Sequence, residues 1–544
     1  MRYERFFSYV FFIFTAMAVF DSGCLESNTG DMEQIEDLGA VVFNTPIKIN
    51  PEYMQVLPFL SAAILNNDWD LQMNENGLTF RDISLFSSEV ALSLWCSAKT
   101  VFVVDSYANA LRMVTPSKLM GAPILVYGQT TKCVLDKIQP LTTIVVGNLD
   151  VIGDVFLTRN EDILRYTADI IGGNKIKEGY ISVVNISIVD TENTDYYNFP
   201  GMAELGSFLC AYRNGMLIMI NNSFDKSQIK DRVFTAVDFF DENITKMEYL
   251  CIVGNLDVIP ACQTEVIIKS NTGEWPRTFF TDNFYTSRAS ELEDMLVPEF
   301  AAGRISVNTA EEFMRLIDVY RNRGFLEENW KKRALIYDTT DSEFSTSGSY
   351  SIIHLTETLC SAGFDTTVKT HILCEIENPQ KDLEESNFAY ILTDEKNGER
   401  GGIIIDNLSL NPSTIFDTTG FSGLDGNFSE SKNIPRKIFK AGAAAYIAPA
   451  GSAIHTILVI WLPEPDDITG VAGDDSSTRL ARLFFEELVM NKTVGEALAK
   501  AKEKYMEKAD MNIDPGASIM TVCEYMLYGD PAFNPYEPRN EGAA

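Results

Sequence analysis

The heptapeptide Val146-Gly-Asn-Leu-Asp-Val-Ile152 recurs without change as Val253-Gly-Asn-Leu-Asp-Val-Ile259. Each copy ends a short apolar run, and a residue typical of turns follows it, Gly153 in the first copy and Pro260 in the second. Identical peptides in equivalent contexts predict two related α/β units, each with a loop at the carboxyl end of a strand. The repeat fits either a shared ligand-binding loop or a strand-turn peptide reused for packing, and the sequence leaves both interpretations open.

Short runs rich in Val, Ile and Leu occur along much of the chain and alternate with helical patterns. Runs that are apolar on both faces are typical of parallel strands covered on two sides. The predicted strands are residues 143–147, 180–189, 216–220, 250–254, 334–337, 402–406 and 443–447. Capping boxes that begin at Thr309 and Thr493 predict two helix starts. The alternation predicts a layered α/β fold of mostly parallel sheets flanked by helices, built from tandem related units.

Length, composition and charge limit the function classes. The chain has 544 residues, more than one domain usually holds. A hydrophobic share of 46% supports a sizeable core, and 22% charged residues exclude both a polytopic membrane protein and wholesale disorder. The net charge of −33 repels phosphate backbones and anionic lipid surfaces. We therefore expect no nucleic-acid partner, and membrane contact only through an N-terminal anchor.

Residues 1–23 have the pattern of a secretory signal peptide. Arg2 and Arg5 precede an uncharged run over residues 6–20, which is too short to span a bilayer as a helix. The following Ser22-Gly-Cys24 resembles the end of a lipobox, although Asp21 stands where an aliphatic residue is usual. A lipidated Cys24 and a plainly cleaved signal are therefore alternatives. Residues 24–45 predict a flexible tether, so we expect an extracellular protein held at the cell surface.

Three stretches between residues 106 and 147 resemble one known repeat. They are Ala108-Asn-Ala-Leu111, Pro116-Ser-Lys-Leu-Met-Gly-Ala-Pro-Ile-Leu-Val126 and Thr143-Ile-Val-Val-Gly147. Their order and composition resemble the cell-wall-binding repeat type 2. The resemblance implies an envelope-facing α/β domain, placed at residues 46–222, with a cell-envelope polymer as its partner.

A second set of motifs follows in order over residues 250–532. They are Ile252-Val-Gly254 with Ile259-Pro260, Thr281-Asp282 with Tyr285, Pro298-Glu-Phe-Ala-Ala-Gly-Arg-Ile305, residues 484–488, Val494-Gly-Glu-Ala497 with Ala501-Lys502 and Tyr505, and Leu527-Tyr-Gly-Asp-Pro-Ala532. The set resembles the gingipain family of cysteine peptidases, family C25, whose fold is related to that of caspases. The resemblance implies a caspase-like α/β domain at residues 223–538, before a tail at 539–544, and a cysteine-type peptidase activity.

The two catalytic positions of that family carry other residues here. Its enzymes place a His at the end of one strand and a Cys at the end of the next, because the imidazole must hold the thiol as a thiolate. With the first strand placed at 402–405, Asp406 or Asn407 occupies the His position and Phe421 the Cys position. A phenyl ring cannot attack a carbonyl carbon. The resemblance therefore implies a peptidase scaffold without a recognisable dyad, and whether the chain is an enzyme stays open.

The histidines and cysteines elsewhere give little support for a dyad. No cysteine lies between Cys374 and Cys523, and no histidine between His371 and His455. We therefore favour a binding protein, with a peptide or envelope polymer held in a cleft above Asp406, Phe421 and Ser422. One alternative is an active extracellular cysteine endopeptidase that uses Cys360 or Cys374. The other is a structural component of the surface or of adhesion.

The one cofactor that the sequence suggests is a calcium ion bound by acidic residues. Asp338 and Asp341 follow a predicted strand, and Asp282 lies in the Thr-Asp motif quoted above. Carboxylate oxygens suit a hard cation such as Ca²⁺. No twelve-residue calcium loop is present, and solvated carboxylates are the alternative in a chain with 77 acidic residues. We expect no other cofactor.

Overall fold

The computed structural model describes most of the chain after residue 45. The described residues are 46–176, 178–187, 201–243, 246–256, 258–270, 273–289, 296–307, 309–321, 329–339, 345–370, 378–393, 395–396, 399–400, 403–418, 434–450, 476–508 and 515–535. The expected signal peptide, the tether and Cys24 lie outside these ranges, as do Asp341, Phe421, Ser422 and the tail. Within these ranges, no helix combines the length and the apolar character that crossing a bilayer needs.

Four short parallel strands form the first sheet, in the order β4-β3-β5-β6. Their bounds are Thr100–Val104 for β3, Ile124–Val126 for β4, Thr142–Val146 for β5 and Val155–Leu157 for β6. Strand β3 is buried on both faces, since Val101 and Val103 pack in one apolar cluster and Phe102 and Val104 in another. Burial on both faces explains its continuous apolar run.

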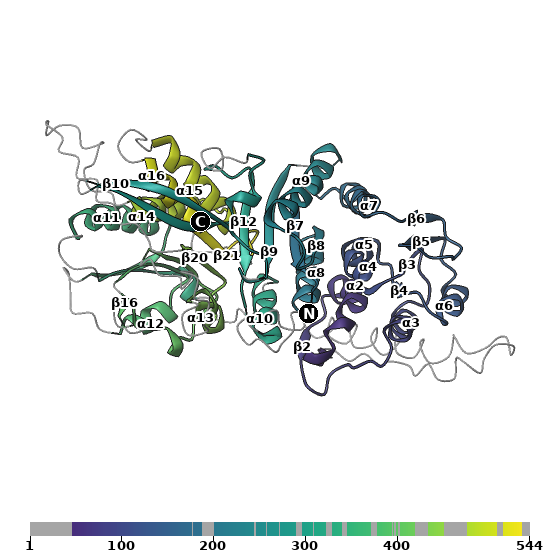
Figure 1. Ribbon diagram of the computed structural model, residues 1–544. Helices are drawn as coiled ribbons and strands as arrows, with labels where there is room; N and C mark the ends of the chain where they lie inside the picture. Colours follow the sequence, from purple (N-terminus) through teal and green to yellow (C-terminus); the bar gives the residue numbers. More distant parts are fainter. Residues whose placement is uncertain are drawn as a thin grey trace.

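Ten strands form the large sheet, in the order β14-β13-β15-β19-β20-β21-β12-β9-β7-β8 (Figure 1). The bounds are Gly179–Asn185 (β7), Met216–Ile220 (β8), Met247–Val253 (β9), Ala301–Ile305 (β12), Arg333–Asp338 (β13), Asp365–Thr370 (β14), Phe388–Leu392 (β15), Thr414–Asp417 (β19), Ala445–Pro449 (β20) and Tyr525–Gly529 (β21). Only the β20–β21 pair is antiparallel. The sheet therefore consists of two parallel five-stranded blocks that run in opposite directions.

One strand order recurs three times along the chain. The groups β4-β3-β5-β6, β8-β7-β9-β12 and β14-β13-β15-β19 all read 2-1-3-4 when each is numbered by its order in the sequence. The repeated heptapeptide follows the third strand in the first two groups. There the N–H of Gly147 donates to the Leu157 carbonyl oxygen at 2.9 Å, and the N–H of Gly254 to that of Ile305 at 3.0 Å. Each acceptor ends the fourth strand, which confirms the prediction of related units.

The two copies of the heptapeptide differ in their surroundings. Ile152 of the first copy is 95% exposed, whereas the equivalent Ile259 of the second copy is fully buried. The second copy also buries Asn255, whose side-chain oxygen accepts a hydrogen bond from the Ser306 hydroxyl. The backbone is thus reused while the side chains serve different environments, which favours the packing interpretation for the second copy.

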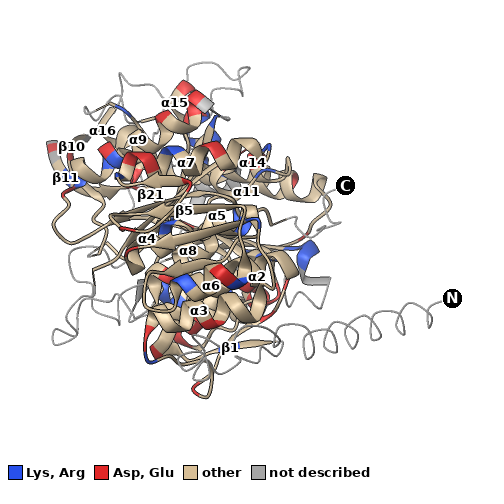
Figure 2. Ribbon diagram, turned by 90° about the vertical axis from the view of Figure 1, so that its right-hand side faces the viewer, with Lys and Arg blue, Asp and Glu red and all other residues tan. Residues whose placement is uncertain are grey.

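Helices cover both faces of the large sheet (Figure 1). One face carries α11 (Ser345–Ser361), α14 (Ser476–Leu488), α15 (Val494–Lys508) and α16 (Pro515–Glu524), and the other carries α10 (Ala310–Tyr320), α12 (Pro379–Glu384) and α13 (Ile434–Ala441). Helices α2 (Leu57–Asn67), α5 (Val114–Met120) and α8 (Met202–Tyr212) pack together between the two sheets. Charged residues lie mostly on outer helices such as α9 (Lys226–Asn243) and α15 (Figure 2). This distribution leaves the apolar strands to form the core.

The predicted helix starts are confirmed. Helix α10 begins after Thr309, whose hydroxyl oxygen accepts a hydrogen bond from the Glu312 N–H at 3.2 Å. Helix α15 begins after Thr493, which accepts from the Glu496 N–H at 3.2 Å while the Glu496 carboxylate accepts from the Thr493 N–H at 3.1 Å. These bonds satisfy N–H groups that have no partner within the helix.

The prediction of a buried parallel strand at residues 402–406 is wrong, because this run does not belong to the large sheet. Ile403–Ile404 forms β18, which pairs antiparallel with β17 (Glu399–Arg400), itself paired with β16 (Glu395–Lys396). Ile404 is 40% exposed, so this run lacks the two buried faces of a central strand. The strand that adjoins β19 in the large sheet is β15 instead. The domain boundary expected at residues 222 and 223 falls within this sheet, because β7 and β8 precede it.

Candidate functional site at the edge shared by the two strand blocks

The antiparallel β20–β21 pair brings two kinds of strand end to one edge of the large sheet. Because Pro449 pairs with Tyr525, the last residue of β20 lies beside the first residue of β21. The carboxyl ends of β13, β15, β19 and β20 therefore share this edge with the beginnings of β21 and β12. Open α/β sheets bind ligands outside the carboxyl ends of their strands, near the point where the strand order reverses. We call this side of the sheet the shared edge.

Buried polar residues end the strands of the first block at the shared edge. Asp338 ends β13 and Asp417 ends β19, and both residues are less than 5% exposed. The Tyr446 hydroxyl donates to Asp417 Oδ2 at 2.6 Å. Across β15, Asp338 pairs with Leu392 whereas Asp417 pairs with Ile391. Neighbouring rows of a sheet point to opposite faces, so the two carboxylates do not form an acid–base pair.

A threonine follows each of two neighbouring strands of the first block, β15 and β19. Thr393 follows β15 and is 3% exposed, and Thr418 follows β19 and is fully buried. The Thr418 hydroxyl donates to the Ile391 carbonyl oxygen at 3.0 Å. The run Phe388–Leu392 is as apolar as the strands that the sequence did identify, so a signal for β15 was present.

The structure places Asp406 and Asn407 outside the strands of the large sheet. They belong to a short 3-10 helix, Ile405–Asn407, which follows β18 before β19 begins. The side chain of Asp406 is 68% exposed and pairs with Lys437 on α13 at 2.8 Å. The Asn407 carbonyl oxygen accepts a hydrogen bond from Gln380 on α12. The prediction that Asp406 or Asn407 takes the His position is therefore corrected, because neither ends a strand of the large sheet.

Helix geometry disfavours a dyad of His354 with Cys360, and burial disfavours Cys523 as a nucleophile. His354 lies on α11 and pairs with Glu357 at 3.5 Å. Cys360 lies six residues further along the same helix, so the side chains of His354 and Cys360 lie on different faces of that helix. Cys523 is fully buried, and burial raises the pKa of its thiol to about 12, so it stays protonated. His371, Cys374 and His455 lie outside the described residues.

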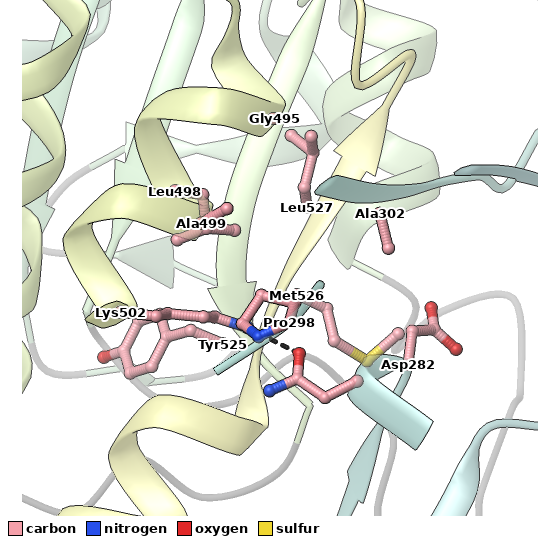
Figure 3. A pocket seen from close by; sticks show the side chains of 11 residues that line it. Asp282, Pro298, Ala302, Gly495, Leu498, Ala499, Lys502, Tyr525, Met526 and Leu527 are labelled. Atoms are coloured by element: carbon pink, nitrogen blue, oxygen red, sulfur yellow. Dashed lines mark hydrogen bonds between the residues drawn. The ribbon is translucent and has the colours of Figure 1, made fainter. Parts of the chain in front are cut away.

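A small cavity opens where β12 and β21 begin (Figure 3). Its lining comes from α15, from the two strand starts and from the segment after β11 (Gly273–Thr281), namely Asp282, Asn283, Pro298, Ala302, Gly495, Leu498, Ala499, Lys502, Tyr525, Met526 and Leu527. Lys502 is 4% exposed, and its ammonium group donates to Asn283 Oδ1 at 2.9 Å. Burial lowers the pKa of Lys502 to about 8. Sequence reasoning used Lys502 only as a landmark of the family resemblance and missed this cavity.

Asp282 is the counter-ion of a buried arginine. Both of its carboxylate oxygens accept hydrogen bonds from Arg304, at 2.9 and 2.6 Å. The Nη1 atom of Arg304 donates to the carbonyl oxygens of Gly254 and Ile259, at 2.9 and 2.7 Å. Burial alone would lower the pKa of Arg304, but the charge of Asp282 outweighs burial and raises it. The pair thus fixes the second copy of the heptapeptide.

This pairing corrects the calcium role predicted for Asp282, because the guanidinium group already occupies its oxygens. In the part of the chain that the structure describes, no three His, Cys, Asp or Glu residues are grouped as metal ligands would be. Asp338 is described and buried, whereas Asp341 is not described. A calcium site that includes Asp341 stays a prediction.

Residues 220–378 match the family model of peptidase family C25. The match confirms the gingipain-type resemblance over that segment and ends before β15 and β19. The layered α/β fold expected from the sequence is also confirmed. The resemblance to the cell-wall-binding repeat stays a prediction.

Several solved structures are similar to this chain at low identity. A protease is 14% identical with a TM-score of 0.46, over 66% of this chain and 78% of its own. Separase in the Saccharomyces cerevisiae separase–securin complex is 11% identical with a TM-score of 0.33, over 62% of this chain and 19% of its own. Cwp8 from Clostridium difficile is 13% identical with a TM-score of 0.27, over 40% of this chain and 46% of its own. Among curated proteins, none matches the sequence.

Proposed function

We propose that this chain is an exported C25-type protein that binds peptides or envelope polymer at the shared edge without cleaving them. The observation that carries the proposal is the pair of strand ends at β15 and β19. Thr393 and Thr418 follow these two strands, and the sequence has neither His nor Cys from residue 388 to residue 433, a stretch that includes Phe421 at the predicted Cys position. The C25 match covers residues 220–378 and does not extend to these two strands.

The chemistry at these strand ends disfavours thiol catalysis. The Thr418 hydroxyl is already bonded to the Ile391 carbonyl oxygen, so its proton is directed away from a substrate. The neighbouring Asp417 carboxylate would oppose the formation of a thiolate even if a thiol were introduced. The histidine that activates the thiol in this family is also missing from this part of the chain, since the sequence holds none between His371 and His455.

Attachment to the cell surface is the second part of the proposal. Its support is the sequence pattern of residues 1–24, in which Arg2 and Arg5 precede an uncharged run and Cys24 follows small residues. Mass spectrometry of the N-terminus of the exported protein tests it. A diacylglyceryl group on Cys24 supports a lipid anchor, a free N-terminus near residue 24 supports plain cleavage, and an intact Met1 in the cytoplasm overturns export.

Incubating the purified full chain with a peptide library at several pH values tests the binding role. Enrichment of intact peptides supports it, and cleavage that iodoacetamide abolishes would establish the active peptidase instead. Neither binding nor cleavage, for peptides and for purified envelope polymer, would favour the structural component.

Hydrogen exchange then locates the bound peptide. A ligand at the shared edge should protect backbone amides of residues 391–393 and 417–418. Amides of β3, in the separate first sheet, serve as the internal control. Protection confined to β3 and its neighbours would move the site to the first sheet and overturn the assignment to the shared edge.

A further inference from the structure

Helices cover only half of one apolar face of the first sheet. On that face Val103, Leu125 and Val145, from β3, β4 and β5, pack in one apolar cluster with residues of α3 (Ile83–Leu94) and α6 (Thr131–Ile138) (Figure 1). Phe156 of β6 points to the same face, because it pairs with Val145 in the register of β5 and β6. Phe156 is nevertheless 50% exposed, so the half of the face at β6 stays open.

Two further exposed apolar side chains adjoin Phe156 where β5 and β6 begin. Leu141 is 79% exposed and Ile152 is 95% exposed. The register of β5 and β6, continued back by three residues, sets Leu141 beside Ile152. The two segments still run side by side there, since the Asp154 N–H donates to the Thr143 carbonyl oxygen at 2.8 Å. We call Leu141, Ile152 and Phe156 the apolar patch.

The short connection from β5 to β6 explains why this half of the face is open. Helix α6 crosses from β4 to β5, and a right-handed crossover from β5 to β6 runs in the same direction and so lies on the same face. Parallel strands are usually joined by about a dozen residues or more, and the connection usually contains a helix. Here it consists only of residues 147–154 and contains no helix. The face beside α6 is therefore left without its usual cover.

The second 2-1-3-4 group, β8-β7-β9-β12, covers the equivalent position. Its longer connection from β9 to β12 contains β10 (Cys262–Ser270), β11 and the 3-10 helix Asn283–Tyr285. Ile259, the heptapeptide equivalent of Ile152, is fully buried and shares an apolar cluster with Tyr285. The same position is thus buried in one unit of this chain and exposed in the other.

Charge indicates the kind of partner that complements the apolar patch. Between Leu141 and Thr158 the only charged residues are Asp150 and Asp154, and both are exposed. The Asp154 carboxylate accepts a hydrogen bond from the Thr143 N–H at 2.7 Å, which holds it at the patch. A second copy of this chain carries a net charge of −33 and is repelled. Apolar residues flanked by Lys or Arg complement both the patch and its acidic border.

We propose that the apolar patch binds an amphipathic helix of another protein, with Lys or Arg residues of that helix near Asp150 and Asp154. A helix fits because α6 already lies on the neighbouring half of the face, and a second helix beside it completes the layer. Such helices are recognised through apolar residues three and four positions apart. The proposal does not depend on the function proposed for the shared edge.

Fluorescence anisotropy of a labelled peptide tests the proposal on the full chain. The probe is a helical peptide with leucines along one face and lysines on the other. It should bind saturably, and a scrambled peptide of the same composition should bind at least tenfold more weakly, as should a peptide with glutamates in place of the lysines. Equal binding of the scrambled peptide would show that charge alone attracts the probe and would overturn the proposal. Equal binding of the glutamate peptide would overturn the basic character of the partner.

Ile152→Ser is the decisive variant, and Ile353→Ser on α11 is the matched control. Ile152 is 95% exposed and Ile353 is 55% exposed, so neither substitution opens a cavity in the core. The affinity for the probe should fall at least tenfold in Ile152→Ser and stay unchanged in Ile353→Ser. Unchanged affinity in Ile152→Ser would refute the assignment of the site.

Two measurements that involve the wild-type chain separate this site from other occupants. In hydrogen exchange, the bound probe should protect backbone amides of residues 149–156 and leave those of α11 unchanged. Protection confined to other segments would contradict the proposal. In sedimentation equilibrium without the probe, the wild-type chain and Ile152→Ser should have the same mass. A larger mass for the wild-type chain would assign the patch to a second copy and overturn the proposal.

Discussion

Replacing Arg304 by Met tests whether one buried ion pair holds the second heptapeptide loop in place. The Arg304 side chain is fully buried and makes four hydrogen bonds, two to Asp282 and two to the carbonyl oxygens of Gly254 and Ile259. The variant leaves the carboxylate of Asp282 and both carbonyl oxygens without these donors. Removing one partner of a buried ion pair costs about 3–5 kcal/mol, so we expect the free energy of unfolding to fall by about that amount.

Urea unfolding at pH 7 measures this change, with Arg288→Met as the matched control. Arg288 pairs with Asp238 at 2.7 Å, but the two side chains are 46% and 56% exposed. Solvent screens such a pair, so the control should lose less than about 1 kcal/mol. Adding Asp282→Leu to Arg304→Met should restore part of the stability, because it removes the unpaired carboxylate. Equal losses for Arg304→Met and Arg288→Met would refute the reasoning.

Three further substitutions test other parts of the structure. Lys502→Met should stabilise the chain at pH 7.5, and this advantage should shrink by about 2 kcal/mol by pH 9.5 in urea unfolding. The reason is that burying the Lys502 ammonium group destabilises the folded state fully below its folded pKa of about 8, and this cost is lost as the pH rises toward the ordinary lysine pKa of 10.5. A stability advantage of the variant that does not change with pH contradicts this reasoning. Gly147→Ala should cost about 2 kcal/mol, since φ is +97° and a Cβ would lie 1.9 Å from Asp105 Oδ2. Gly173→Ala, with nothing within 4 Å, is the thermal-unfolding control. Thr493→Ala should cost about 1 kcal/mol and Thr493→Ser much less, because only alanine removes the cap on Glu496 N–H; equal melting temperatures would exclude the cap.

Local patterns in the sequence were sufficient for the fold class and for several elements. The run 216–220 coincides with β8, because it is apolar on both faces and the strand is buried on both. The capping boxes at Thr309 and Thr493 form as expected, since they depend only on residues three positions apart. The repeated heptapeptide indicated equivalent loops, and both copies follow the third strand of a 2-1-3-4 group.

The composition of the large sheet and the cavity depend on distant residues. The runs 388–392 and 402–405 are both apolar, and pairing with β13 and β19 selects the first for the large sheet. The predicted His position failed for that reason. The cavity joins Lys502 to Asn283, which lies 219 residues earlier in the chain. The sequence motif around Asp282 does not reveal that Arg304 on β12 is its partner, so a metal role could be predicted from the motif alone. Hydrophobic periodicity in the sequence predicts helices and strands but gives no information on which distant residues pair.

The place of β21 in the large sheet has a consequence for biosynthesis. Among the ten described strands of this sheet, Tyr525–Gly529 is the last to be synthesised, yet it lies between β20 and β12 and contacts both. Until it arrives, both neighbours present bare backbone donors and acceptors, and the blocks remain separate half-sheets. Unpaired edges of this kind recruit other chains. A nascent chain halted shortly before residue 525 should therefore depend on chaperones far more than the completed one.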